Sequence, residues 1–256
     1  MMRRTILLMA TMALTLLVSS GVALAVTKIG GPGPNTLRGT NRADNLFGKG
    51  GNDVLFALGG RDNLFGGEGK DWLLGGNERR AFGGDKNLVG GPGNDGVQGG
   101  LGSDNALGGS GNDFVHGDNG SDTVSGGEGR DFVDGANGAD RMLGGEGSDF
   151  LIDGPIDEAS KDTLAAGDGN DIIITDHVPA DQDLVSCGSG LDRAIVDRED
   201  IVAGDCERVR VVHGSVEEVF EQQGAFFESL PPAVSEFFFG TFWEGLAPDP
   251  TGGLEG

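Results

Sequence analysis

Apolar side chains recur every nine residues between Gly90 and Ile152, and this spacing is the clearest pattern in the chain. A period of nine matches neither a helix nor a long strand, but it matches a strand of about three residues followed by a turn of about six. The stretch holds seven consecutive nonapeptides, whose eighth positions are Val97, Ala106, Val115, Val124, Val133, Met142 and Leu151. Because side chains alternate across a strand, the eighth residue points to one face and its neighbours to the other.

Two such nonapeptides make one coil of a solenoid, in which two strands face each other across the apolar side chains. Coils stacked about 4.8 Å apart form two parallel sheets. Each turn then stacks on the turn two repeats along the chain, so Asp95 and Asp113 belong to one column and Asp104 and Asp122 to the other. The sequence therefore predicts an all-β fold, a parallel β-roll (β-solenoid) of nonapeptide repeats, with a short helical C-terminal tail.

A second array with the same period comes earlier in the chain. Five nonapeptides run from Gly30 to Leu74, and each has leucine at position eight. The first turns of this array depart from the glycine pattern, which is typical of the terminal repeat of a solenoid. We expect the roll to cover residues 26–174.

The turn half of the repeat reads GGxGxD, with the aspartate at position six. Glycine takes positive φ and allows close backbone approach, so these turns can direct carbonyl oxygens toward a common centre. Stacked aspartates would repel one another, and a divalent cation between the turns removes that repulsion. Calcium takes six to eight oxygen ligands in flexible geometry, whereas magnesium needs a tight octahedron.

One isolated copy of this motif is more simply explained as a turn. Repetition in register predicts instead that several Ca2+ ions bind between the turns. The expected metal ligands are Asp53, Asp62, Asp71, Asp95, Asp104, Asp113, Asp122, Asp131, Asp140, Asp149, Asp162 and Asp171. Asp44 occupies the same position in a degraded turn and is left out of this set.

The motif G-G-x-G-x-D-x-U-x, where U is apolar, resembles the RTX, or hemolysin-type, calcium-binding repeat. That resemblance implies a parallel β-roll that holds calcium through aspartates and turn carbonyls. Because such rolls often accompany hydrolases, three functions stay open. The chain is a non-catalytic calcium-binding roll, an accessory part of a secreted hydrolase or toxin, or an adhesin or cell-envelope module.

The register breaks at residues 75–89, which hold fifteen residues where two repeats need eighteen. Phe82 and Leu88 still match the apolar position, but Arg80 and Lys86 stand where aspartates are expected. Either the metal column is interrupted there, or an irregular loop separates two rolls.

A second irregular segment ends at Asp162 and is four residues too long for one repeat, which predicts a bulging turn. Residues 175–213 are expected to form one more coil and a closing cap. Cys187 and Cys206 are the two cysteines, and in an exported chain such a pair predicts a disulfide.

Residues 1–25 have the pattern of a signal peptide, with Arg3 and Arg4 before an apolar core and Ala23-Leu24-Ala25 as the cleavage site. An uncleaved anchor is the alternative, although the core is short for a membrane span. Cleavage removes two arginines and no acid, which takes the net charge from −23 to −25. That charge disfavours nucleic acid and favours cations, so we expect a secreted monomer with calcium as its partner.

Residues 214–256 form an aromatic-rich tail that opens with a helical pattern after Ser215. The tail is expected to pack over the open end of the roll, to contact a cell-surface or protein partner, or to stay disordered.

Catalytic motifs are absent from the sequence. It has no H-E-x-x-H zinc site, no G-x-S-x-G elbow and no phosphate-binding loop. His116 lies at position nine of a repeat, where solvent exposure is expected. The sequence predicts a protein without enzymatic activity.

Overall fold

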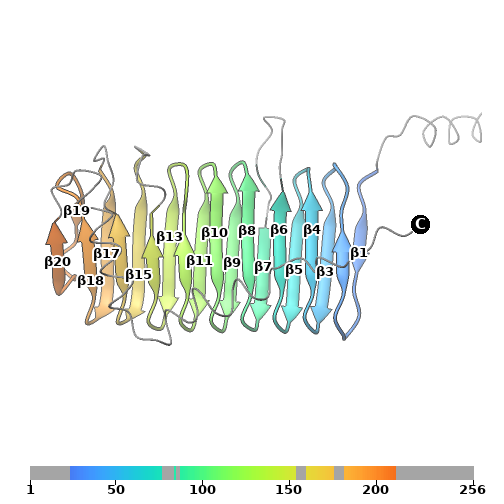
Figure 1. Cartoon of the computed structure of the whole chain (residues 1–256), viewed down its shortest axis with the longest axis horizontal. Coiled ribbons are helices and arrows are strands. Elements are labelled where there is room, and N and C mark those ends of the chain that lie inside the picture. Colours follow the sequence, from blue (N-terminus) through green and yellow to red (C-terminus); the bar gives the residue numbers. More distant parts are fainter. Residues whose placement is uncertain (1–23, 77–83, 85–86, 154–159, 176–181, 212–256) are drawn as a thin grey trace, which may run out of the picture. The chain divides into compact units, whose positions relative to one another are not determined.

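The computed structural model describes residues 24–76, 84, 87–153, 160–175 and 182–211. These residues form twenty strands and no helix, arranged as two ten-stranded parallel sheets (Figure 1). The predicted all-β parallel β-solenoid is therefore confirmed. The expected signal-peptide core, Phe82 and the aromatic-rich tail lie outside the described residues.

One sheet contains the odd-numbered strands in chain order. They are β1 (Thr27–Ile29), β3 (Asn45–Gly50), β5 (Asn63–Glu68), β7 (Asn87–Pro92), β9 (Asn105–Ser110), β11 (Thr123–Glu128), β13 (Arg141–Glu146), β15 (Thr163–Gly169), β17 (Leu184–Gly190) and β19 (Ile201–Val202). The other sheet contains the even-numbered strands. They are β2 (Thr36–Arg38), β4 (Val54–Leu58), β6 (Trp72–Gly76), β8 (Gly96–Leu101), β10 (Phe114–Asn119), β12 (Phe132–Asp134), β14 (Phe150–Ile152), β16 (Ile172–Thr175), β18 (Arg193–Val196) and β20 (Arg208–Val211).

The core between the sheets consists chiefly of the residues at position eight. Val115 and Val133 pair across β10 and β12, and Ala106 and Val124 pair across β9 and β11. All four side chains are fully buried. Each repeat thus adds one apolar side chain to the core, which is little hydrophobic burial for nine ordered residues.

The sheets continue through the register break at residues 75–89. Strand β5 pairs with β7 and β6 pairs with β8, so the two sheets are not divided there. Asp71 and Asp95 are 24 residues apart, against 18 in a regular coil. The six extra residues therefore lengthen a single coil. Leu88 is fully buried, as its apolar position predicts.

All the lengthened connections in the described chain lead from an even strand to the next odd strand. They join β6 to β7, β14 to β15 and β16 to β17. The pairing of Arg141 with Thr163 shows that the extra residues before Asp162 leave the register intact. We call the turns from odd to even strands the first edge of the roll, and those from even to odd strands the second edge.

The roll extends further than the repeats suggest. Strands β17 to β20 continue both sheets, so the stretch expected as one coil and a cap contains two further coils. The predicted disulfide joins Cys187 to Cys206. Within the part of the chain that the structure describes, no helix is long and apolar enough to cross a membrane.

Candidate metal centre

Each repeat aspartate lies at the end of a turn, immediately before the strand that carries the core residue. Its Oδ1 atom accepts a hydrogen bond from the backbone N–H of the aspartate one coil earlier. The Asp95 N–H donates to Asp113 at 2.8 Å, and the Asp104 N–H donates to Asp122 at 2.7 Å. The carboxylates therefore join consecutive coils before any ion is considered.

These bonds sort the predicted ligands into two columns, as the period of nine requires. The first edge carries Asp53, Asp71, Asp95, Asp113, Asp131, Asp149 and Asp171. The second edge carries Asp62, Asp104, Asp122, Asp140 and Asp162. All twelve side chains are buried.

The other carboxylate oxygen, Oδ2, is left without a donor along the first edge. Within the described residues, no hydrogen bond reaches the buried Oδ2 atom of Asp53, Asp71, Asp95, Asp113, Asp131, Asp149 or Asp171. A buried carboxylate oxygen without a partner is costly, so these seven atoms call for a cation or a proton.

The surroundings of Oδ2 are rich in oxygen. A methyl group placed on Gly108 would come within 2.5 Å of Asp113 Oδ2 and 2.6 Å of the Gly126 carbonyl oxygen, one coil further on. The same construction on Gly90 meets Asp95 Oδ2 at 2.6 Å and the Gly108 carbonyl at 2.5 Å. A carboxylate from one turn and a carbonyl from the next thus converge beside Gly90 and Gly108, and also beside Gly48, Gly66 and Gly144.

The pKa values of these acids reflect their burial. The pKa of Asp113 is raised to about 8: burial raises it most, the hydrogen bond from the Asp95 N–H lowers it, and the charges of Asp131 and Asp95 raise it. The pKa of Asp122 is raised to about 8 and that of Asp149 to about 7, again chiefly by burial. Without a cation, such carboxyls hold protons near neutral pH.

Calcium fits this donor set. Calcium prefers carboxylate and carbonyl oxygens in a flexible shell, which is what two stacked turns offer. When bound, a calcium ion would supply positive charge that holds neighbouring carboxylates ionised and joins one coil to the next.

Three acids outside the predicted ligand set lie in the same columns. Asp44 and Asp183 occupy the second edge and Asp192 the first, and all three are buried. Their turns depart from GGxG, but each is followed two residues later by a buried apolar residue: Leu46, Val185 and Ala194. The D-x-U half of the motif would have identified them.

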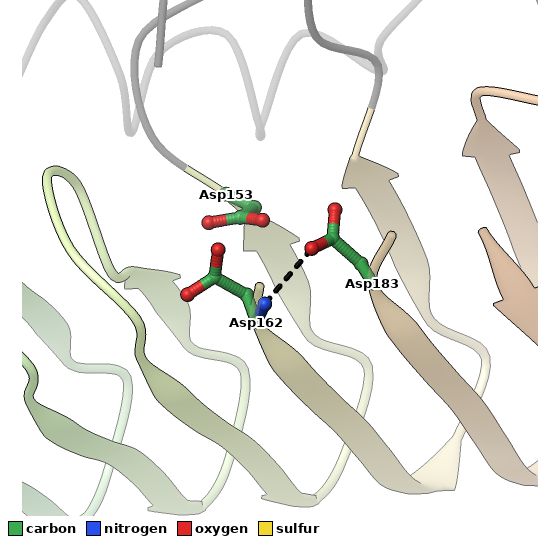
Figure 2. A group of neighbouring side chains, drawn as sticks. All are labelled: Asp153, Asp162 and Asp183. Carbon is green, nitrogen blue, oxygen red and sulfur yellow. Dashed lines mark hydrogen bonds between the residues drawn. The ribbon is translucent and has the colours of Figure 1, made fainter. Parts of the chain in front are cut away.

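A group of three aspartates lies at the second edge, near the lengthened connection from β14 to β15. Asp153, Asp162 and Asp183 each place one carboxylate oxygen within 4.8 Å of the others, and all three are buried (Figure 2). The Asp162 N–H donates to Asp183 Oδ1 at 2.8 Å, as in the regular coils. The Asp153 N–H donates to Ile174 O, which is the hydrogen bond that position one of a repeat makes in the regular coils. Asp153 therefore stands where a regular turn has glycine, and it adds a third carboxylate.

His116 is not simply exposed, contrary to the sequence expectation. Its Nε2 lies 3.1 Å from Asp118 Oδ1 and its Nδ1 lies 3.0 Å from Asp134 Oδ2. Burial of the ring lowers its pKa, but hydrogen bonds and charges from the two aspartates outweigh burial and raise the pKa to about 10. A protonated histidine thus joins two neighbouring coils on the outer face.

Two stacked sheets, glycine turns and columns of buried aspartates define a β-roll of the metal-binding class. The family of the RTX calcium-binding nonapeptide repeat matches residues 29–64, 47–78, 81–115, 116–151 and 158–176. These ranges cover more than half of the chain, and the protein belongs to this family of calcium-binding repeats. No curated protein matches the chain.

Proposed function

We propose that this chain is an exported, non-catalytic calcium-binding β-roll whose folding is coupled to Ca2+ ligation. The aspartates of the two columns are its ligands, together with the carbonyl oxygens of the turns. The observation that supports this most directly is the series of buried Oδ2 atoms at the first edge, each without a donor among the described residues. Those of Asp53, Asp71, Asp95, Asp113 and Asp149 also lie beside a carbonyl of the next coil.

The coupling of folding to calcium binding follows from the small hydrophobic core and the many buried carboxylates. Each repeat contributes one core residue, and its glycines lose more backbone entropy than other residues on folding. Each bound ion adds RT ln(1 + [Ca]/Kd), which is about 1.4 kcal/mol at ten times Kd. Several ions together offset the ordering cost, so the transition with calcium is expected to be cooperative.

Export is supported by the leader pattern of residues 1–25 and by the disulfide between Cys187 and Cys206. Disulfides persist in oxidising, extracytoplasmic compartments. Free calcium is also far more plentiful outside the cell. We therefore place the folded form of the protein outside the cytoplasm.

The test is a calcium titration of the chain from residue 26 to residue 256, followed by circular dichroism and calorimetry together. A cooperative gain of β-sheet signal with heat released by ion binding is expected, and magnesium should produce little of either. Identical spectra in saturating calcium and in excess chelator would refute the proposal.

A further inference from the structure

The first edge has one more stacked turn than the matched repeats. The family match ends at residue 176, but the column of carboxylates continues to Asp192 in the turn between β17 and β18. The Asp171 N–H donates to Asp192 Oδ1 at 2.8 Å, which is the bond made between regular coils. Asp192 is fully buried, and no described residue donates a hydrogen bond to its Oδ2 atom.

The chain closes this turn with the short segment of residues 203–207. Here Glu207 takes the place of the next aspartate, because its Oε2 accepts the Asp192 N–H at 3.0 Å. Asp192 and Glu207 are 15 residues apart, three fewer than in a regular coil. The side chain of glutamate is one methylene longer than that of aspartate, which suits the shorter segment.

Cys206 lies between Asp205 and Glu207 in the sequence. Its disulfide to Cys187 fixes both acids against β17. Asp205 is held by donors from β17: Ser186 Oγ at 2.8 Å, the Gly188 N–H at 3.1 Å and the Cys187 N–H at 3.3 Å. Its oxygens are thus occupied, so Asp205 anchors the segment and leaves Glu207 as the second carboxylate of the joint.

We propose that Asp192 and Glu207 form a terminal calcium site outside the recognised repeats, assembled by the Cys187–Cys206 disulfide. This rests on the proposed function, because it assigns the same ion to residues that the motif does not identify. Burial, and then the negative charges of Glu207 and Asp205, raise the pKa of Asp192, which is consistent with a carboxyl that needs a cation. Because the disulfide positions Glu207, the affinity of this site depends on the oxidised state of the two cysteines.

Hydrogen exchange of the chain from residue 26 tests this site separately from the central coils. Calcium should slow amide exchange in β19 and β20 as well as in β9 to β11. In Glu207→Gln the calcium effect should fall at least about tenfold in β19 and β20 and remain unchanged in β9 to β11. Glu199→Gln removes another exposed acid of the closing coils and should behave as the wild type.

The role of the disulfide is tested by hydrogen exchange of the wild-type chain in saturating calcium, with and without reductant. A disulfide that closes a loop of this length lowers the equilibrium constant for local opening by about a hundredfold. Reduction should therefore raise the rate of amide exchange in β19 and β20 and leave β9 to β11 protected. Cys187→Ala/Cys206→Ala should match the reduced protein and show no response to reductant.

Normal calcium protection of β19 and β20 in Glu207→Gln overturns the terminal site. Unchanged protection on reduction overturns the role of the disulfide. If β9 to β11 themselves fail to respond to calcium, the proposed function fails instead, and the two failures are thus distinguishable.

Discussion

Replacing Asp113 with asparagine should change the stability of the roll in opposite directions with and without calcium. Asp113 lies in the middle of the first edge, and its pKa is raised from 3.8 to about 8. Keeping this carboxyl in the metal-free fold at pH 7 therefore costs about 4 kcal/mol relative to the unfolded chain, as proton uptake. Asparagine removes that cost and retains an Oδ1 acceptor for the Asp95 N–H.

In excess chelator, Asp113→Asn should be the more ordered protein. A gain of about 2–4 kcal/mol corresponds to a rise in melting temperature of roughly 4–16 °C for a domain of this size. In saturating calcium the order reverses, because loss of one ion removes about 1.4–2.7 kcal/mol at ten to a hundred times Kd. Circular dichroism melts in both conditions measure the two effects.

Glu128→Gln is the matched control. It removes the same charge from an exposed side chain at the same edge, and surface changes of this kind stay within about 0.5 kcal/mol. If Asp113→Asn were destabilised equally in calcium and in chelator, the Asp113 carboxylate would stabilise the roll without a metal ion and would not be a metal ligand. The interpretation of the columns would then be wrong.

Three further outcomes are expected. The raised pKa values of Asp95, at about 7, and Asp113, at about 8, mean that the metal-free roll loses stability as pH rises from about 4 to 8, because the folded form holds protons that the unfolded chain has already lost. Calcium then competes with fewer protons, so the calcium midpoint should fall over that range. Proton release should be detectable by calorimetry in buffers of different ionisation enthalpy. Asp153→Asn should weaken one calcium site about tenfold in the calorimetric titration without changing the others, and an unchanged isotherm would exclude Asp153 as a ligand. Gly111→Ala should destabilise the calcium-bound roll by more than about 3 kcal/mol in thermal melts, because its φ is +133° and the added methyl would collide with the Gly93 carbonyl, whereas Gly204→Ala, where nothing lies within 4 Å, should be tolerated.

The sequence by itself determined the fold class and the two columns. A period of nine allows one core side chain per short strand, and the alternation of turns places every second aspartate in the same column. Val115 and Asp113 could be assigned to the core and to the turn from that spacing alone, because local geometry repeats wherever the motif repeats.

Other features depended on contacts between coils that the motif does not encode. The continuity of the sheets at residues 75–89 follows from the pairing of β5 with β7, which no local pattern specifies. The ion pairs of His116 with Asp118 and Asp134 need a turn and a neighbouring coil to come together.

The tertiary structure also decided which acids belong to the site. Asp183 and Asp192 lie in degraded turns, and Glu207 replaces an aspartate, yet the stacking of coils brings all three into the columns. The physical reason is that a column is defined by backbone hydrogen bonds from one coil to the next. The identity of the turn residues therefore matters less than the register of the strand that follows.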